Sequence, residues 1–184
     1  MPVVHFDYLG WMAKYNRQIS DIEEFKTRLE RFTFIHNWIN EHNQQGALWT
    51  AGHNKFSDWS EAELASTLGY NGQRDKDVFT LLEETDVTSV DWRQNGAVTP
   101  VKDQGTCGAS WAFATTGSIE SAHFAKTGEL VSLSEQQLLD CAGTMYGNQG
   151  CSGGWFTRAY KYYEMGHKAE LETTYPWTGT QGTC

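Results

Sequence analysis

The chain has 184 residues and a formal net charge of −9, because 23 Asp and Glu outnumber 14 Lys and Arg. This length accommodates one ordinary domain, or a small module followed by part of a second one. With 39% hydrophobic residues and eight Trp, the chain can bury a core, which excludes a largely disordered protein. It contains no apolar run of the roughly 18 residues that a membrane span needs. The acidic balance also disfavours a phosphate backbone as partner, so neither a nucleic-acid nor a membrane role is expected.

The N-terminal part carries many charges and no Cys, and its periodicity predicts a long amphipathic helix. Apolar residues recur at three- and four-residue steps and form one stripe: Phe25, Leu29, Phe32, Ile35 and Ile39. A helix over residues 24–43 is about 30 Å long. Ser60 and Glu63 have capping-box spacing and predict a short second helix. The polar, Gly-containing stretch 69–77 is typical of a linker.

The remaining part holds all four Cys and most of the Gly, and its patterns are also helical. One helix is predicted from Ser110 to about Lys126, closed by Gly128. A capping box at residues 134–137 opens a short helix that runs through Cys141. A third helix is predicted over residues 155–165. Period-two patterning is weak, so few strands are expected.

The segment Gln104-Gly105-Thr106-Cys107-Gly108-Ala109-Ser110-Trp111 carries the chemistry. A nucleophile at a helix N-terminus is activated by the unpaired N–H groups and the helix dipole. Acyl transfer also requires donors aimed at the developing oxyanion, commonly a backbone N–H and a side-chain amide. The segment supplies the amide of Gln104, a Gly-rich turn and a helix start at Ser110. Taken alone, Ser110 is an ordinary helix N-cap.

Residues 107–111 match four of the five positions of the signature C-G-[SA]-C-[WY], with Ser110 in place of the second Cys. On this segment and on residues 91–105, 134–141, 150–154 and 175–177, the chain resembles the papain-like cysteine peptidases. The resemblance implies an α+β family fold that is mainly α in this chain. A helical propeptide module with its linker would span residues 1–84, and the N-terminal, left part of the peptidase domain would span residues 85–184.

The upstream module is similar to the inhibitory propeptide of the cathepsin L-like branch. The matching positions are Glu24, Arg28, Phe32, Ile39 and Asn43 on the long helix, followed by Gly52, Asn54, Phe56 and Asp58. Ile35 stands where the family usually has Asn. The resemblance implies that residues 78–82 cross the cleft and that acid releases the propeptide by protonating carboxylates. The candidate carboxylates are Asp7, Asp21, Glu23, Glu24 and Asp58.

The resemblance also implies residue roles. Gln104 would be the oxyanion-hole side chain, and Ser110 would occupy the nucleophile position. Four residues would bind substrate: Gly153, Gly154, Trp155 and Phe156. The implied disulfides are Cys107–Cys151 and Cys141–Cys184. Zinc held by the four Cys is disfavoured because no C-x-x-C pair exists, and neither a metal nor a cofactor is expected.

Two departures from the family predict a chain that is inactive as given. A Ser hydroxyl is a far weaker nucleophile than a thiolate at neutral pH. The family's His and Asn follow the nucleophile by roughly 130 to 150 residues, which lies beyond Cys184. The main hypothesis is therefore a cysteine endopeptidase proenzyme that is catalytically silent in this form. The alternative is a non-catalytic pseudo-peptidase or a propeptide-type inhibitor.

The expected partners follow from these hypotheses. They are a peptide or protein substrate, or a related peptidase, together with the chain's own propeptide in the cleft. A partner that covers an exposed inner apolar face is a further expectation. Two disulfides imply a lysosomal or secreted protein, although Met1 to Asp7 show no signal peptide.

Overall fold

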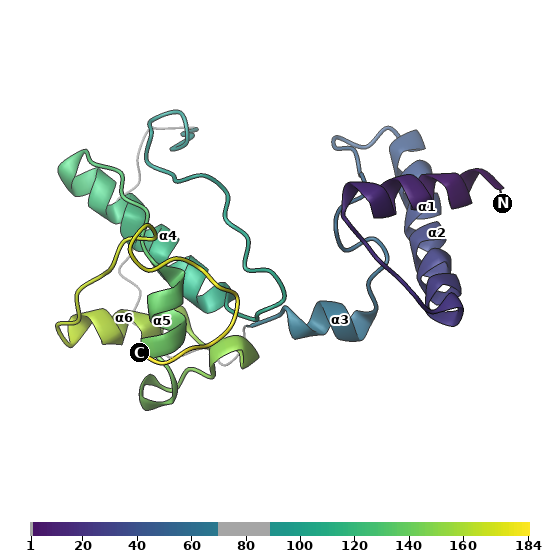
Figure 1. The fold of residues 1–184 in the computed structure, drawn as a ribbon. Helices are drawn as coiled ribbons and strands as arrows, with labels where there is room; N and C mark the ends of the chain where they lie inside the picture. Colours follow the sequence, from purple (N-terminus) through teal and green to yellow (C-terminus); the bar gives the residue numbers. More distant parts are fainter. Residues whose placement is uncertain (1, 70–88) are drawn as a thin grey trace. The chain divides into compact units, whose positions relative to one another are not determined.

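The computed structural model describes residues 2–69 and 89–184, which divide into an N-terminal unit (residues 1–65) and a C-terminal unit (residues 66–184). The helices in chain order are α1 (Pro2–Lys14), α2 (Ile22–Gln44), α3 (Glu61–Ser66), α4 (Ser110–Thr127), α5 (Glu135–Cys141) and α6 (Phe156–Glu164) (Figure 1). Two 3-10 turns, η1 (Thr144–Tyr146) and η2 (Gly150–Ser152), separate α5 from α6. Most of the predicted linker, the stretch 78–82 and the boundary between residues 84 and 85 lie outside the described residues.

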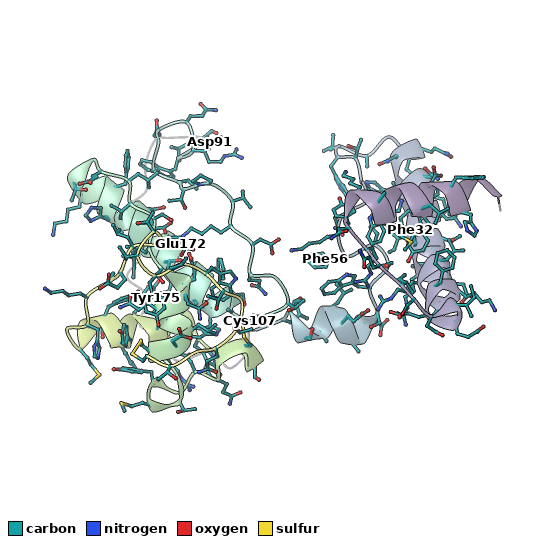
Figure 2. All side chains as sticks on the ribbon, viewed as in Figure 1. Phe32, Phe56, Asp91, Cys107, Glu172 and Tyr175 are labelled. Atoms are coloured by element: carbon teal, nitrogen blue, oxygen red, sulfur yellow. A yellow bond between two sulfur atoms is a disulfide. The ribbon has the colours of Figure 1, made fainter. Side chains whose placement is uncertain are left out.

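In the N-terminal unit, α1 crosses α2 (Figure 1). Aromatic side chains fill the space between the two helices. Phe32 of α2 packs against Tyr8 and Trp11 of α1, with ring centroids 5.0 and 5.6 Å apart, and all three are buried. Figure 2 shows Phe32 inside this unit. The predicted helix over residues 24–43 is confirmed and begins two residues earlier, where the Asp21 carboxylate accepts a hydrogen bond from Glu24 N.

The sequence does not predict α1, because its apolar residues do not form one stripe. Tyr8 and Trp11 are buried, whereas Phe6 and Leu9 on the same helix are exposed. The short helix predicted from Ser60 is present as α3, and its capping box is complete. Ser60 Oγ accepts a hydrogen bond from Glu63 N at 3.1 Å, and Ser60 N donates to the Glu63 carboxylate at 2.7 Å.

In the C-terminal unit, α4, α5 and α6 pack around one apolar core. Its buried members are Cys107, Ala109, Trp111, Ala112, Leu138, Leu139, Ala142, Ala159 and Tyr162. Gly128 ends α4 in the left-handed conformation, as predicted. Ser110 is the first residue of α4 rather than its N-cap, which is Ala109, so the ordinary capping role considered for Ser110 is wrong.

The capping box predicted at the start of α5 is only half formed. Ser134 Oγ accepts a hydrogen bond from Gln137 N at 2.9 Å, but the Gln137 side chain does not return to Ser134. It bonds instead to Lys168 O and Glu170 N, and Ser134 N donates to Glu170 O. These contacts tie α5 to residues 168–170, beside an isolated antiparallel bridge between Leu133 and Leu171.

Two glycines should respond in opposite ways to alanine. Gly10 lies in the exposed interior of α1 with no atom within 4 Å of a built Cβ, so Gly10→Ala should stabilise the N-terminal unit by about 0.5–1 kcal/mol. Gly128 has a φ of 78°, so Gly128→Ala should destabilise the C-terminal unit by about 1 kcal/mol. Amide hydrogen exchange in α2 and in α4 measures the two effects separately. Reduced protection of α2 in Gly10→Ala would contradict the first expectation.

Candidate functional site

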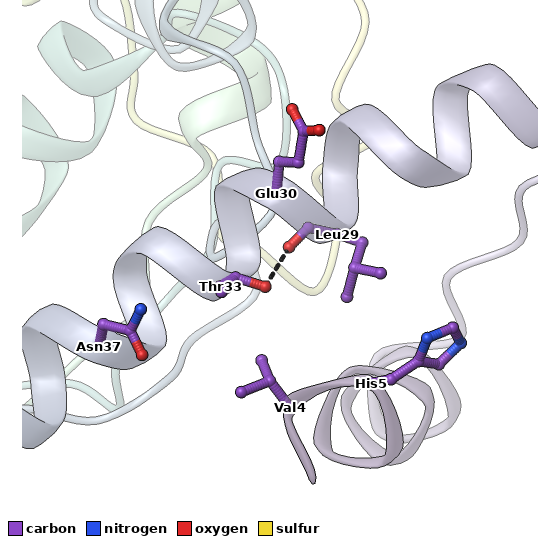
Figure 3. Close-up of a pocket in the computed structure, with 6 residues that line it drawn as sticks. All are labelled: Val4, His5, Leu29, Glu30, Thr33 and Asn37. Atoms are coloured by element: carbon purple, nitrogen blue, oxygen red, sulfur yellow. Dashed lines mark hydrogen bonds between the residues drawn. The ribbon is translucent and has the colours of Figure 1, made fainter. Parts of the chain in front are cut away.

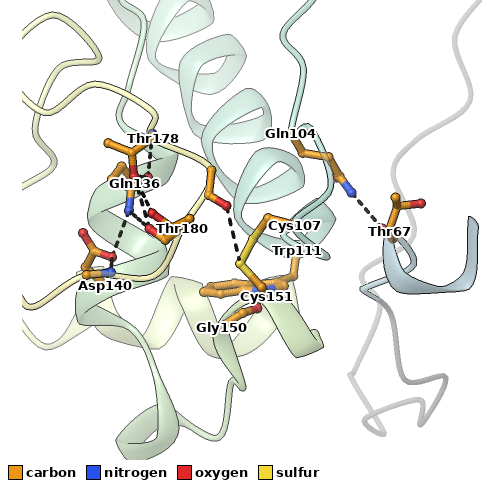
Figure 4. The surroundings of a disulfide bond; sticks show 12 residues. Thr67, Gln104, Cys107, Trp111, Gln136, Asp140, Gly150, Cys151, Thr178 and Thr180 are labelled. Carbon is orange, nitrogen blue, oxygen red and sulfur yellow. Dashed lines mark hydrogen bonds between the residues drawn. A yellow bond between two sulfur atoms is a disulfide. The ribbon is translucent and has the colours of Figure 1, made fainter. Parts of the chain in front are cut away.

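The start of α4 is fastened to η2 by a disulfide and two hydrogen bonds. Cys107, just before α4, is joined to Cys151 of η2 (Figure 4). Gly108 N donates to Cys151 O at 3.0 Å, and the buried Trp111 donates through Nε1 to Gly150 O at 3.1 Å. Ser110 is therefore held at the N-terminus of α4 by contacts on both sides of it. The second disulfide joins Cys141, at the end of α5, to Cys184.

Two buried glycines follow η2 and bring a backbone N–H to this region. Gly153 has a φ of 113°, which an L side chain rarely adopts. A Cβ on Gly154 would lie 2.6 Å from Asn148 Oδ1 and 2.8 Å from the Trp111 ring, so no side chain fits there. Asn148 is itself fixed, because it donates to Ala142 O and accepts from Trp155 N. The position of Gly154 N is thus set by packing on both sides.

Residues 66–69 of the same unit lie against these groups. Gln104 Nε2 donates to Thr67 O at 2.7 Å (Figure 4), and Gly154 N donates to Gly69 O at 2.8 Å. A Cβ on Gly69 would overlap the carbonyl oxygen of Gly108 and would lie 3.1 Å from Ser110 Oγ. Gln104, Ser110 and Gly154 are therefore brought together around one short stretch of backbone, whose carbonyl oxygens accept the hydrogen bonds of both donors.

Trp155 is the N-cap of α6 and Phe156 is its first residue, and the rings of both contact side chains of that helix. The guanidinium carbon of Arg158 lies 3.7 Å from the Trp155 ring centroid, a cation–π contact. Phe156 is exposed and meets Tyr160 edge-on at 6.1 Å. The expected substrate pocket at these two residues stays a prediction.

In the C-terminal unit, the ammonium group of Lys102 binds two buried carboxylates, those of Glu120 on α4 and Glu135 on α5. Lys102 Nζ donates to Glu120 at 2.9 Å, to Glu135 at 2.6 Å and to Leu133 O at 3.1 Å. Burial raises the pKa of Glu135, although the hydrogen bonds from Lys102 and Thr116 act to lower it. Burial opposes a charged Lys102, but the bonds to Glu135 and Glu120 outweigh it and raise the pKa of Lys102. This cluster could not be predicted from local patterns, because Lys102, Glu120 and Glu135 are 15 to 33 positions apart in different elements.

In the N-terminal unit, the motif residue Asp58 is fully buried and accepts three contacts. Tyr8 donates its hydroxyl to Asp58 Oδ2 at 3.0 Å, and Arg17 Nε lies 3.1 Å from the same oxygen. Arg28 donates to the backbone oxygen of Asp58 at 3.3 Å. Burial raises the pKa of Tyr8, so its hydroxyl stays a donor. Asp58 therefore joins α1, α2 and the loop that precedes α3.

Arg28 also links α2 to α3. Its guanidinium bonds Glu24 at 2.7 Å and both oxygens of Glu63, at 3.2 and 2.6 Å. The Arg28 hydrogen bond is the main reason that the pKa of Glu63 falls to about 2. Glu63 was not among the carboxylates expected from the sequence, although its capping-box position marked it.

The remaining motif positions shape the loop after α2. Asn43 and Ala51 make two hydrogen bonds. Asn43 Nδ2 donates to Ala51 O at 3.0 Å, and Ala51 N donates to Asn43 Oδ1 at 2.7 Å. Asn54 Oδ1 accepts from Phe56 N at 2.8 Å. Ile39 is buried. A Cβ on Gly52 meets no atom within 4 Å, so nothing in the structure explains glycine there.

A groove of about 570 Å³ lies between α1 and α2 (Figure 3). Its lining is Val4, His5, Leu29, Glu30, Thr33 and Asn37. The Thr33 hydroxyl donates to Leu29 O within its own helix, and none of the residues named in the candidate site lies here. Across residues 2–69 and 89–184, no three His, Cys, Asp or Glu side chains converge as a metal site. No helix in the same ranges is long and apolar enough to cross a bilayer.

Comparisons with known proteins agree with these two units. Residues 87–184 match the model of the papain family cysteine proteases, and residues 8–64 match that of the cathepsin propeptide inhibitor domain. The chain is 46% identical to digestive cysteine proteinase 1 of Homarus americanus, over 94% of this chain and 56% of that protein. It is 41% identical to a cathepsin L-like peptidase of Aedes aegypti, over 99% and 58%.

Solved structures give the same result. A stem bromelain precursor matches with a TM-score of 0.83 and 34% identity, over 98% of this chain and 59% of that one. Digestive procathepsin L2 from the larval midgut of Tenebrio molitor matches with a TM-score of 0.84 and 33% identity, over 98% and 62%. The chain thus spans somewhat more than half the length of these relatives.

The buried charge cluster of Lys102, Glu120 and Glu135 should not tolerate the loss of its cation, Lys102. Lys102→Met leaves two buried carboxylates without an ammonium partner and should destabilise the C-terminal unit by about 3 kcal/mol. Lys126→Met, on the exposed end of α4, is the matched control and should change stability by less than about 0.5 kcal/mol. Urea unfolding followed by exchange in α4 measures both. Equal effects of the two substitutions would show that the Lys102 cluster does not contribute to the stability of the C-terminal unit.

Proposed function

The chain belongs to the papain family of cysteine proteases and carries a cathepsin propeptide inhibitor domain, and from this we propose that it is a propeptide-inhibited endopeptidase precursor that is silent at its nucleophile. The reaction of the family is hydrolysis of peptide bonds by a thiol. In this proposal Gln104 is the oxyanion donor, Ser110 occupies the nucleophile position, and Gly153 and Gly154 bind substrate backbone. Trp155 and Phe156 would contact an apolar substrate side chain.

One observation carries the inhibitory part of the proposal. The side-chain amide of Gln104 and the backbone N–H of Gly154 each donate to a carbonyl oxygen of residues 66–69. A substrate needs the same donors, one for the developing oxyanion and one for its backbone. Because Gly69 packs directly on Gly108 beside Ser110, a substrate cannot enter while this stretch is in place.

The silence of the site is inferred from the chemistry of Ser110. The first turn of a helix favours an anion at this position, but by far less than is needed to ionise a hydroxyl near neutral pH. A thiol in the same place would be partly ionised, because thiol pKa values start near 8.5 and fall at helix N-termini. We therefore expect no turnover of a fluorogenic peptide by the chain as it stands.

The location follows from the two disulfides. Disulfides persist in oxidising compartments and are rare in the cytosol. We propose that the protein is located in a lysosome or outside the cell, because it contains two disulfides.

A reporter thiol tests the occupied site. All four Cys are paired, so Ser110→Cys provides a single alkylation site for iodoacetamide. Alkylation should be slow in this variant and at least about tenfold faster when Gly69→Val is added, because the valine side chain overlaps Gly108 and displaces residues 66–69.

The matched control for the reporter is Gly10→Val in the same Ser110→Cys background, since a side chain at position 10 meets no neighbouring atom. It should leave the alkylation rate unchanged. Peptide mapping verifies that both native disulfides persist. Identical rates with glycine and valine at position 69 would contradict the proposal that residues 66–69 close the site.

A second candidate function is inhibition of a related peptidase in trans. It is supported by the N-terminal unit, which is compact and has its own aromatic core. The chain should then inhibit an active cathepsin L-like enzyme with a Ki below about 1 μM. Phe32→Ala, which empties the core, should abolish inhibition, whereas Phe6→Ala at an exposed position should not. No inhibition at about 10 μM would exclude this function.

A further inference from the structure

Two histidines of the N-terminal unit are in direct contact. His36 lies on α2, and His53 lies in the loop between α2 and α3; His36 Nδ1 and His53 Nε2 are 3.2 Å apart. The His53 ring lies flat on the buried Phe32, with centroids 4.2 Å apart and an interplanar angle of 7°. One face of His53 is therefore covered by the core, and one edge faces a second imidazole.

This contact holds only while at least one ring is neutral. A hydrogen bond between two imidazoles needs one protonated and one bare nitrogen, and an imidazolium has two N–H groups and no acceptor. His53 Nδ1 is buried and has no hydrogen-bond partner among the described residues. A proton added to His53 would therefore either break the contact with His36 or place an unpaired N–H in the protein interior.

The charges around the pair do not compensate such a proton. From α1, Asp7 faces His36, with Oδ2 4.0 Å from Nε2, and it is half exposed. Tyr15, just after α1, faces the backbone of His53, to whose carbonyl oxygen it donates at 3.5 Å. The charged groups that act on His53 are His36, which repels a positive charge, and Asp7, which attracts one more weakly. Among the residues that the structure describes, His53 thus has no close anion of its own.

The loop that contains His53 also carries contacts that hold α1. Trp11 Nε1 donates to Asn54 O at 2.9 Å, one residue after His53, and Tyr8 donates to Asp58. Displacement of His53 from Phe32 would pull on both contacts. The pair is therefore placed where its loss would affect α1, α2 and the loop between α2 and α3.

We propose that His36 and His53 form an acid-sensitive latch of the N-terminal unit, which opens when both imidazoles are protonated. The proposal deepens the proposed function, on which its biological meaning rests, because an opened propeptide module would no longer inhibit. It differs from release by carboxylate protonation in its residues and in its pH range.

The pH range follows from linkage. Burial, followed by repulsion from His36, lowers the pKa of His53 below its usual 6.5. The unfolded chain then binds more protons than the folded one, so stability is present above pH 6.5 and is lost as the pH falls below it. The pKa of Glu63 is about 2 instead of 4.5, so its contribution is lost only as the pH falls from 4.5 towards 2. The histidine pair therefore acts first.

Hydrogen exchange on the full chain tests the latch. After correction for intrinsic rates, protection in α2 and residues 52–58 should fall between pH 7 and pH 5, by up to about tenfold per pH unit for a one-proton difference. His53→Gln, which keeps a polar side chain without titrating there, should remove this fall. His42→Gln on the same helix is the matched control, because His42 contacts Trp49 rather than a histidine, and it should behave as the unsubstituted chain.

Several outcomes would overturn the latch. One is unchanged protection of the unsubstituted chain between pH 7 and pH 5, which needs no variant. Another is a normal fall in His53→Gln or, if that variant does not fold, in His36→Gln, which removes the same contact but keeps the stack on Phe32. A third is loss of the fall in His42→Gln. Because this exchange is read only in residues 22–58, failure of the Ser110→Cys experiment would overturn the proposed function without changing this result.

Discussion

The join between the start of α4 and η2 is the constraint on which the candidate site depends. The Cys107–Cys151 bridge closes a loop with a sequence separation of 44 and, in the chain-entropy model, contributes about 4 kcal/mol. Gly108 N and the Trp111 indole bond the same turn, which holds it in place beside the disulfide. With that turn fixed, Ser110, Gln104 and Gly154 can all lie against residues 66–69 only if the residues at the points of closest approach have no side chains.

Glycine supplies that condition at three places. A Cβ on Gly108 would overlap Cys151 O, a Cβ on Gly69 would overlap Gly108 O, and a Cβ on Gly154 would meet the Trp111 ring. Three backbones therefore lie closer to one another than side chains would allow. These close approaches let the disulfide-fixed turn and its neighbours bind residues 66–69 through the Gln104 amide and Gly154 N.

Local patterns predicted most of the helices, because caps and apolar stripes act within a few residues. The helix of Phe32 and Ile39 and the helix after Ala109 both follow from such patterns. The helix α1 was not predicted, because Phe6 and Leu9 are exposed and its apolar residues therefore do not form a single stripe. Contacts between distant segments could not be predicted. The Gln137 side chain bonds residues 168–170 instead of completing the capping box with Ser134. Residues 66–69 contact Gln104 through backbone atoms, which side-chain patterns in the sequence do not reveal.

The contacts that residues 66–69 make in the candidate site differ from those of the N-terminal unit in how they respond to protons. The contacts that close the candidate site, from Gln104 to Thr67 and from Gly154 to Gly69, join an amide or N–H to a carbonyl, so none of the four groups titrates in the physiological range. Acid cannot weaken these bonds directly. In the N-terminal unit, by contrast, titratable side chains make contacts between elements, because the imidazoles of His36 and His53 share one contact and Glu63 bonds Arg28. In the proposed latch, a fall in pH acts on the fold of the N-terminal unit before it acts on the contacts of residues 66–69.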